Sequence, residues 1–289
     1  MGVGNFFGML PDSMADSRLY GVELDSITGR IAKKLYPQAD ITVAGFETTD
    51  RRDFYDLAVG NVPFGQYKVN DKAYNKLGFS IHNYFFAKAI DQIRPGGVIA
   101  FVTSRFTMDS KDSTARKHMA ERADLLGAIR LPNDTFTKNA GTKVTSDILF
   151  LQKRDHMTLE EPDWVYLDYD DNGIEQNRYY VRHPEMILGE MVMESGPYGM
   201  RSTCRPYEGR ELSELLSVAV EALKGTIEEV ELEELIEEED HTIPADPSVN
   251  NYSYTLVDGK LYYRENSRMK PGSLPMTGTN RVKGMIAIR

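Results

Sequence analysis

The feature that most constrains the fold is an alternation of strand-like and helix-like runs over residues 1–155. The strand-like runs are short, apolar and rich in β-branched residues, whereas the helix-like runs repeat apolar residues every three or four positions. This alternation predicts an α/β protein with a doubly wound sheet. Strands are expected at residues 19–23, 40–44, 54–60, 98–103, 125–131 and 146–152, helices at 26–36, 81–93 and 113–122, and a turn at 94–97.

A tetrapeptide with a specific chemical character, Asn61, Val62, Pro63 and Phe64, directly follows the apolar run 54–60. The Asn side-chain oxygen and the next backbone carbonyl both accept hydrogen bonds, so together they suit an exocyclic NH2 group. The proline stiffens the turn, and the aromatic ring provides a face on which a base stacks. The tetrapeptide therefore indicates methylation of an amino nitrogen in a nucleic acid or a similar substrate.

A glycine loop opens the chain, with Gly2, Gly4 and Asn5 in positions that let the backbone approach a ligand. Glu23 ends the next expected strand, about twenty residues later, where dinucleotide-binding folds place an acid on ribose hydroxyls. An ordinary turn and a neighbour of a helix N-cap are the structural alternatives for these residues. No phosphate-binding lysine follows the loop, which argues against a nucleoside triphosphate.

Phe46 and Glu47 follow the expected strand 40–44 and suit an adenine ring, Phe46 by packing on it and Glu47 by accepting from its amino group. The alternative is a capped loop with a core Phe. Together with the glycine loop, Glu23 and the tetrapeptide, this order of motifs resembles the S-adenosylmethionine-dependent amino-methyltransferases. That family carries a Gly-x-Gly loop, a ribose-binding acid and an Asn-Pro-Pro-Tyr/Phe motif on successive strands.

Later motifs narrow the resemblance. The segments Arg94-Pro-Gly-Gly97, Leu131-Pro132 with Phe136, and Thr145–Lys153 are similar to those of N6-adenine DNA methylases. That group includes the modification subunits of type I restriction systems and the methylase region of large methylase–helicase polypeptides of mobile elements. Two departures stand out: Val62 replaces the first Pro, and Gly45 replaces an acid, so that Glu47 has to substitute for it.

The resemblance implies a Rossmann-like, doubly wound, seven-stranded methyltransferase sheet with a C-terminal α+β extension. It implies S-adenosyl-L-methionine as cofactor, DNA as partner and the adenine N6 amino group as methyl acceptor. A helicase region of the same parent polypeptide is a further expected partner. The family's first strand precedes the glycine loop, and the chain starts at that loop, so we expect a fragment or a start at an internal methionine.

Two polar, basic and aromatic loops are expected to contact DNA, one at residues 66–76 just past the tetrapeptide and one at 135–143. A plain surface loop is the alternative for the first, whereas the second faces the same site if the sheet closes as expected. The candidate contacts are Tyr67, Lys68, Lys72, Phe136, Lys138 and Lys143.

The charge of the chain is unevenly distributed. Its net charge is −10, but residues 1–155 carry 21 Lys and Arg against 18 Asp and Glu, and residues 156–289 carry 13 against 26. The N-terminal part is therefore able to approach a polyanion that the rest would avoid. Residues 208–241 hold 13 of the acids, which indicates a solvated helix face or, alternatively, a surface that docks a partner or mimics DNA.

Several classes of protein are excluded by composition. The single Cys204 excludes an internal disulfide framework and a cysteine zinc cluster, and the five histidines show no ligand spacing, so no metal is expected. No apolar run approaches the ~18–20 residues that span a bilayer, and no signal peptide is evident. A cytoplasmic protein without membrane contact is the expectation.

The chain divides by pattern into a catalytic domain (1–155), a β-rich extension (156–210) and an acidic helix with a hairpin-containing tail (211–289). The helix is expected over 209–240, with a break at Gly225-Thr226, and the hairpin turns at Asp258-Gly259. Alternative functions are methylation of cytosine N4, RNA or protein glutamine, and a degenerate methylase fold that serves as a scaffold in a DNA-processing protein.

Overall fold

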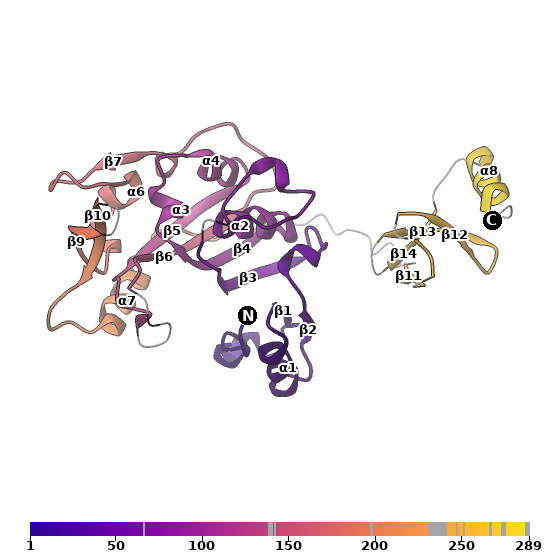
Figure 1. The fold of residues 1–289 in the computed structure, drawn as a ribbon, viewed down its shortest axis with the longest axis horizontal. Helices are drawn as coiled ribbons and strands as arrows, with labels where there is room; N and C mark the ends of the chain where they lie inside the picture. Colours follow the sequence, from indigo (N-terminus) through magenta and orange to yellow (C-terminus); the bar gives the residue numbers. More distant parts are fainter. Residues whose placement is uncertain are drawn as a thin grey trace. The chain divides into compact units, whose positions relative to one another are not determined.

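The computed structural model describes residues 1–65, 67–137, 141, 143–196, 199–230, 242–246, 248–250, 252–265, 268–272 and 276–286. The chain forms two compact units, Met1–Val230 and Glu231–Arg289 (Figure 1). The boundaries at 155 and 210 that the sequence suggests both lie inside the first unit.

The main sheet of the first unit has four strands in the order β3-β4-β6-β5, with β3 parallel to β4 and the other two pairs antiparallel. The strands are β3 (Tyr55–Asn61), β4 (Ile93–Ser104), β5 (Ala123–Leu131) and β6 (Ser146–Lys153). These directions bring the C-terminal ends of β3, β4 and β5 to one edge, together with the start of β6. The expected mixed α/β class is confirmed.

A smaller parallel sheet pairs β1 (Tyr20–Glu23) with β2 (Asp40–Val43), and α1 (Ser26–Leu35) connects them. Asp25 caps α1, because its carboxylate accepts a hydrogen bond of 2.7 Å from the backbone of Thr28. Among the described residues neither strand pairs with the main sheet, so the seven-stranded sheet is not confirmed. The expectation of a further strand ahead of the glycine loop stays a prediction.

The apolar face of α1 is largely solvent-exposed. Ala32 is buried, but Ile27, Ile31 and Leu35 are 60%, 45% and 58% exposed. The helix approaches its sheet through Gly29, where a Cβ would lie only 2.8 Å from Val43 Cγ2. A two-stranded sheet offers too little area to cover the rest of the apolar face.

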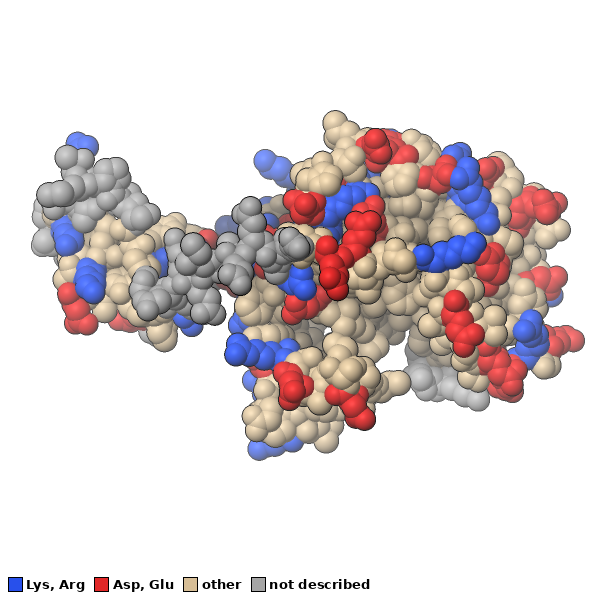
Figure 2. Space-filling view, turned by 180° about the vertical axis from the view of Figure 1, so that it is seen from behind, with Lys and Arg blue, Asp and Glu red and all other residues tan. Residues whose placement is uncertain are grey.

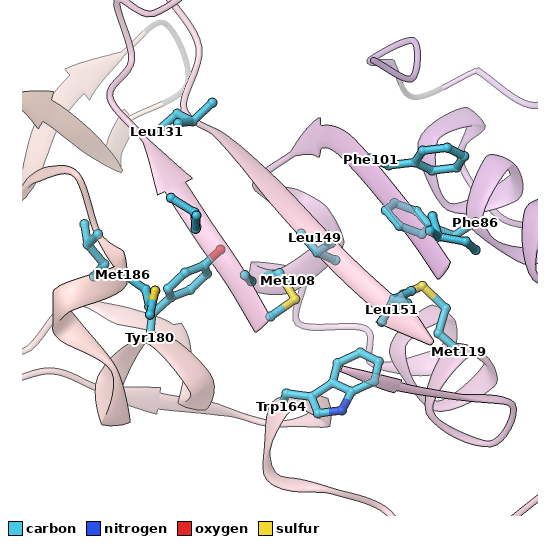
Figure 3. Packing of buried hydrophobic residues seen from close by; sticks show 14 of the residues in the cluster. Phe86, Phe101, Met108, Met119, Leu131, Leu149, Leu151, Trp164, Tyr180 and Met186 are labelled. Atoms are coloured by element: carbon cyan, nitrogen blue, oxygen red, sulfur yellow. The ribbon is translucent and has the colours of Figure 1, made fainter. Parts of the chain in front are cut away.

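The core of the first unit lies on both faces of the main sheet (Figure 3). Helix α2 (Ile81–Gln92) is buried almost all round, which suits its lack of a polar face. Its Phe86 meets Phe101 of β4 with ring centroids 5.2 Å apart. Two short helices, α3 (Phe106–Asp109) and α4 (Thr114–Ala120), contribute Met108 and Met119 to the same core.

Strand β4 begins earlier than the sequence suggests. The pairing with β3 steps from Tyr55↔Ile93 to Leu57↔Val98, so residues 94–97 form an irregular excursion of the strand rather than a separate turn. Gly96 has φ +77 there, a conformation that glycine adopts without strain. Strand β4 therefore begins directly after helix α2.

The segment after the main sheet is rich in β structure, as expected. It contains two antiparallel pairs, and Trp164, Tyr180, Met186 and Cys204 from this region belong to the same core cluster as the main sheet. The strands are β7 (Leu167–Tyr169), β8 (Glu175–Asn177), β9 (Gly189–Gly196) and β10 (Gly199–Pro206), and the helix is α6 (Arg178–Arg182). The extension and residues 1–155 thus share one core.

The prediction of a long helix over residues 209–240 is wrong for much of that range. Helix α7 covers only Leu212–Glu221, and residues 223–230 are not helical. There Gly225 approaches the main sheet so closely that a Cβ would lie 2.1 Å from the Leu126 carbonyl oxygen. The side chain of Gln152 also accepts from Glu228 N and donates to Glu228 O, which replaces helical hydrogen bonds. Residues 231–241 lie outside the described residues.

The second unit contains a four-stranded antiparallel sheet in the order β11-β14-β13-β12. The expected hairpin is present, and Asp258 and Gly259 at its turn both have positive φ, 51 and 75, as a type I′ turn requires. The elements are β11 (Ile243–Pro244), β12 (Tyr254–Val257), β13 (Lys260–Glu265), β14 (Arg268–Pro271) and α8 (Met276–Ile286).

Short 3-10 helices complete the elements. They are η1 (Phe7–Met9), η2 (Asp12–Met14), η3 (Phe46–Thr48), η4 (Asn75–Leu77), η5 (Asp163–Val165) and η6 (Pro184–Met186). On the face drawn in Figure 2, acidic and basic side chains are interspersed and form no large area of one sign. Any polyanion-binding site on this face would therefore depend on local groups of side chains.

Candidate functional site

The tetrapeptide lies at the edge of the main sheet where β3, β4 and β5 end. Asn61 is the last residue of β3 and pairs in register with Val102. Val62 is 4% exposed, and its N–H donates to the Val102 carbonyl at 3.0 Å, so the ladder continues one residue past the strand. Phe64 is half-buried against the core. The turn is therefore held on both sides of Pro63.

Two acceptors of the tetrapeptide remain available. Asn61 is exposed, and within the described part of the chain its side-chain amide has no hydrogen-bond partner. The carbonyl of Val62 likewise receives no N–H from a described residue, although the Val62 N–H is engaged. This arrangement has the acceptor pair that an exocyclic amino group needs.

The glycine loop and Glu23, which the sequence predicts to be parts of one ligand site, are in direct contact. The N–H of Gly2 donates to Glu23 Oε2 at 2.7 Å, and Asp25 N–H donates to Oε1 at 2.9 Å. Partial burial would raise the pKa of Glu23, but the backbone donors of Asp25 and Gly2 and the Met1 ammonium group, 3.1 Å from Oε2, outweigh it, so its pKa lies below the ordinary value. The carboxylate is therefore ionised at neutral pH, and Oε1 keeps one acceptor position for a hydroxyl.

The two loop glycines differ in their surroundings. Gly2 has φ +62 and nothing within 4 Å of where a Cβ would stand. Gly4 has φ +93, and a Cβ on it would lie only 2.5 Å from the ring of Tyr36. Gly4 is thus required by packing as well as by conformation, and the open space beside Gly2 suits a ligand. Asn5, the third candidate of this loop, is exposed.

Phe46 packs against helix α2. Its ring stacks on Phe85 with centroids 4.7 Å apart and planes 27° apart. Glu47 is exposed, and its carboxylate bends toward Gly45, so that a Cβ on Gly45 would lie 2.1 Å from Glu47 Oε1. The carboxylate of Glu47 therefore occupies the space of a side chain at position 45, which is consistent with its substituting for an acid there.

Sequence reasoning missed a buried ion pair that joins two of the candidate loops. Lys88 on α2 is 4% exposed, and its Nζ donates to the Glu47 carbonyl at 3.0 Å and to Asp71 Oδ2 at 2.8 Å. Tyr84 also donates to Asp71 Oδ2, at 2.8 Å. Burial would raise the pKa of Asp71, but these donors hold it below the ordinary value. The lysine within the apolar run from Tyr84 to Ile90 was the sequence feature that could have revealed this ion pair.

The candidate DNA contacts of the first loop have different environments. Lys68 lines a cavity of about 290 Å³, together with Tyr74, Phe79 and Tyr84. Tyr67 and Lys72 are exposed. The loop is fixed near its beginning, because the Tyr67 carbonyl accepts from Ile81 N–H at 3.0 Å.

The second loop leaves the sheet edge after β5. Phe136 packs against the core, whereas Lys143 is exposed and lines a hollow of about 120 Å³ beside the end of β4. Val144 N–H donates to the Asn133 carbonyl at 2.7 Å and closes the neck of the loop. Lys138 lies outside the described residues.

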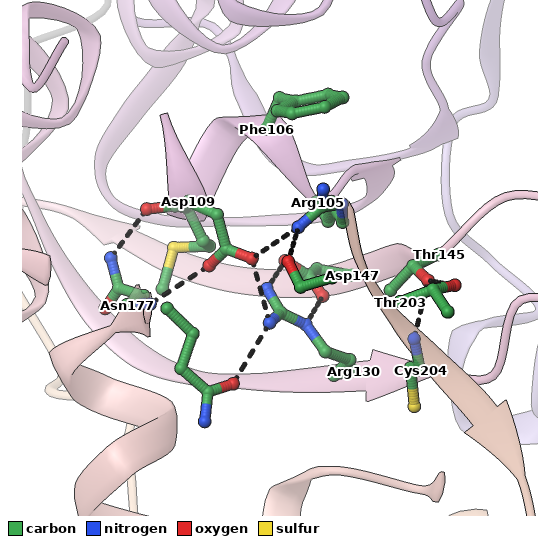
Figure 4. Close-up of polar contacts among 12 residues, drawn as sticks. Arg105, Phe106, Asp109, Arg130, Thr145, Asp147, Asn177, Thr203 and Cys204 are labelled. Carbon is green, nitrogen blue, oxygen red and sulfur yellow. Dashed lines mark hydrogen bonds and ion pairs between the residues drawn. The ribbon is translucent and has the colours of Figure 1, made fainter. Parts of the chain in front are cut away.

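A buried network of charges lies beneath this edge and was also missed (Figure 4). Arg130 of β5 and Asp147 of β6 are fully buried cross-strand neighbours joined by two hydrogen bonds of 2.8 and 3.0 Å. Asp109 binds Arg130 at 2.9 Å and Arg105 at 3.4 Å. Burial would lower the pKa of Arg130, but the two carboxylates outweigh it and raise it. The sequence feature that could have revealed this network was the presence of opposite charges in two neighbouring apolar strands.

Two further observations concern metals and membranes. Within the described residues, no three His, Cys, Asp or Glu side chains come close enough to hold a metal ion. The described helices are all too short or too polar to cross a membrane. Cys204 is buried, and burial raises its pKa to about 12, so it is not a reactive thiolate at neutral pH.

Solved structures show partial similarity to the chain. A candidate class I S-adenosylmethionine-dependent methyltransferase from Listeria monocytogenes has TM-score 0.45 and 20% identity, over 53% of this chain and 51% of that one. A modification subunit of a candidate type I restriction enzyme from Vibrio vulnificus has TM-score 0.45 and 14% identity, over 75% and 55%. A type I restriction-modification methyltransferase subunit from Streptococcus thermophilus has TM-score 0.39 and 18% identity, over 47% and 34%.

No family model matches the chain. A curated protein of Escherichia phage P1, Defense against restriction protein B, is 33% identical over 138 residues. These residues are 45% of this chain and 6% of the phage protein, so the chain spans a small part of that protein's length.

Proposed function

We propose that this chain transfers a methyl group from S-adenosylmethionine to the N6 amino group of adenine in DNA. The observation that carries the proposal is the arrangement of Asn61, Val62 and Phe64 at the end of β3: two available acceptors beside a supported aromatic ring. The proposed site is the edge of the main sheet where parallel strands end, the usual place for ligands in open α/β sheets.

The acceptor pair would act on the adenine amino group itself. Its lone pair is delocalised into the ring, so it is a weak nucleophile, and positive charge develops on nitrogen as it attacks. Asn61 Oδ1 and the Val62 carbonyl would each accept one N–H and stabilise that charge, an interaction that is stronger in the transition state than in the ground state. Val62 is anchored by Val102, so its carbonyl needs no reorganisation.

Phe64 would stack on the base, which has to leave the duplex at an energy of a few kcal/mol. Bound S-adenosylmethionine supplies an electrophilic methyl group on a sulfonium. Residues of the glycine loop fit such a cofactor, because Gly2 has open space and Glu23 keeps an acceptor for a ribose hydroxyl. Glu47 would accept from the cofactor's adenine amino group, and Phe46 would pack on its ring.

The substrate class has separate support. The phage protein that matches this chain is named for defence against restriction, and restriction acts on DNA. Lys68, Lys72 and Lys143 would contact the DNA backbone, with Tyr67, Phe136 and Lys138 as further contacts. A cytoplasmic location and a helicase region in the same parent polypeptide complete the proposal.

Methyl transfer from labelled cofactor to unmethylated DNA tests the proposal. The parent is expected to form N6-methyladenine, and Asn61→Ala is expected to lose about 10²- to 10³-fold in kcat, the range seen when one such polar contact is removed. Nucleoside analysis by mass spectrometry separates N6-methyladenine from N4-methylcytosine. Retained cofactor binding in Asn61→Ala shows that the variant is folded.

Two results would contradict the proposal. Folded parent protein that binds the cofactor but methylates no DNA would favour a scaffold role. Undiminished transfer by Asn61→Ala would exclude the proposed mechanism.

A further inference from the structure

A second polar site is formed where three segments meet at the same edge of the sheet. The residues after β4, the connection between β5 and β6, and the β9–β10 hairpin enclose the hollow of about 120 Å³ that Lys143 lines. Arg105 comes from the first segment and Arg201 from the third. The hairpin, which lies beyond the expected catalytic region, thus forms one wall of this hollow.

The charges of the hollow do not cancel. Its one carboxylate, Glu194, is paired with Arg205 at 3.4 Å, and Arg105 is paired with Asp109. Lys143 and Arg201 are exposed, and no described carboxylate lies within salt-bridge distance of either, although Glu194 is opposite Arg201 in the β9–β10 register. Two cations are therefore left to attract an anion, and close spacing in a hollow strengthens their joint field.

The walls of the hollow are held by buried hydrogen bonds (Figure 4). Thr203 of the hairpin accepts from Asn133 Nδ2 at 2.9 Å and shares a hydrogen bond of 3.1 Å with Thr145. Thr145 Oγ1 also accepts from Cys204 N–H at 3.0 Å. These contacts fix the hairpin to the β5–β6 connection, so the cations of the two segments are positioned before a ligand arrives.

Arg105 is also held in place by a hydrogen bond and an ion pair. Its Nη1 donates to Ser202 Oγ at 2.8 Å, and its carboxylate partner Asp109 is held in turn by Arg130. Its guanidinium lies over the ring of Phe106, 4.7 Å from the centroid, and that ring is 45% exposed. A cation and an exposed aromatic ring side by side suit a phosphate and a neighbouring base.

The size and place of the hollow indicate the ligand. Its volume is several times what one water molecule needs, which suits a phosphate group better than a whole nucleotide. Arg105 follows directly after β4, whose Val102 pairs with Asn61. The hollow and the tetrapeptide thus lie at the ends of neighbouring strands.

We propose that this hollow binds one phosphate group of the nucleic-acid strand whose base reaches Asn61, with Lys143 and Arg201 supplying the charge. The inference rests on the substrate class of the proposed function, a nucleic acid, but not on methyl transfer.

Salt-dependent binding of a short single-stranded oligonucleotide in phosphate-free buffer tests this inference. Lys143→Gln, Arg201→Gln and the double variant are compared with the parent, and Lys33→Gln on α1 is the matched control for loss of one exposed positive charge. The double variant is expected to lower the slope of log K against log salt by about 0.7, the value for one phosphate on a single strand. The control is expected to leave the slope unchanged.

Two kinds of result would overturn the inference. One is a slope of log K against log salt that is unchanged in the double variant, or that falls by the amount expected for two phosphates. Either outcome would exclude the proposal that Lys143 and Arg201 bind one phosphate together. A single neutral methylphosphonate linkage, moved along the strand, should abolish the difference between parent and double variant at one position. A difference that persists at every position, or binding of inorganic phosphate with no effect on the oligonucleotide, would also exclude it.

The test is independent of the proposed function. Asn61→Ala should keep the parental slope, and loss of methyl transfer in that variant tests only the chemistry. Absence of transfer in the parent would remove the proposed function and leave the slope comparison valid.

Discussion

At the scale of single residues, the tetrapeptide combines one exposed side chain with two supported ones. Asn61 is exposed at the end of β3, whereas Val62 and Phe64 pack against the core. Substitutions of Asn61 and Phe64 should therefore affect different properties. Removing the amide affects chemistry alone, and removing the ring also removes packing.

Phe64→Ala is expected to lower kcat/KM for DNA by about 10- to 100-fold, because base–aromatic stacking contributes ~1–3 kcal/mol per base. Phe64→Tyr keeps the ring and should stay close to the parent. Methyl-transfer kinetics on both variants provide the measurement, and thermal melting reports the packing loss separately. Full activity in Phe64→Ala would show that the ring does not stack on the base.

The lowered pKa of Glu23 predicts that the stability of the protein depends on pH. Its pKa is lowered in the folded state from the ordinary 4.5, so its stabilising contribution is present above pH 4.5 and is lost as the pH falls through the folded pKa. Glu23→Gln should therefore be less stable than the parent at pH 7, and the difference should narrow toward pH 3. Urea unfolding at several pH values measures it. A constant difference would contradict the argument.

At the scale of elements, the antiparallel pair of β5, the edge strand, and β6 contains two charged residues in an apolar setting. Arg130 and Asp147 face each other in register and are fully buried. The pair would be costly to break, because removing one partner leaves an uncompensated charge in the core. It therefore constrains the register of β5 on β6, from which both the 135–143 loop and the hollow extend.

Arg130→Met is expected to destabilise the protein by about 3–5 kcal/mol, whereas the double variant Arg130→Met with Asp147→Leu should recover most of that loss. Asp109 keeps Arg105 as a partner in both variants. Urea unfolding of the parent and both variants provides the free energies of unfolding. Equal losses in the single and double variants would show that packing rather than charge dominates.

At the scale of the whole molecule, the extension after residue 155 shares one core with residues 1–155. Trp164, Tyr180 and Cys204 pack in the same cluster as β4, β5 and β6, and Asn177 donates to the carbonyls of Met108 and Trp164. Removing the extension would expose this apolar surface and leave buried polar groups without partners.

A protein of residues 1–155 is therefore expected to aggregate or stay unfolded, whereas residues 1–230, the first compact unit, should unfold in one cooperative transition. Gel filtration and circular dichroism melting of both proteins check this. A stable, monomeric 1–155 would contradict the shared core.

Much of the local structure could be predicted from the sequence. The expected strands at 19–23, 54–60 and 146–152 and the helices at 26–36 and 81–93 lie within one or two residues of β1, β3, β6, α1 and α2. Their hydrophobic period is a property of a few neighbouring residues. The sequence also indicated Gly2 and Glu23 as parts of one ligand site, but their direct contact is known only from the structure.

The remaining features depend on distant partners. Residues 223–230 leave the helical pattern because Gly225 and Glu228 contact Leu126 and Gln152. The burial of Lys88 on α2 depends on Asp71 and on the Glu47 carbonyl, which both accept hydrogen bonds from its ammonium group. No local pattern encodes such partners, because they lie many residues away along the chain.

By itself, the sequence determined the alternating elements, the tetrapeptide at the end of β3 and the chemistry that its residue types allow. Only the tertiary structure decided that the strands of residues 1–155 separate into two sheets, and that the β9–β10 hairpin joins Arg105 and Lys143 around one hollow. The physical reason is the separation along the chain of the residues that interact. Periodicity and residue type act over a few positions, whereas Asn133 meets Thr203 only when segments seventy residues apart pack together.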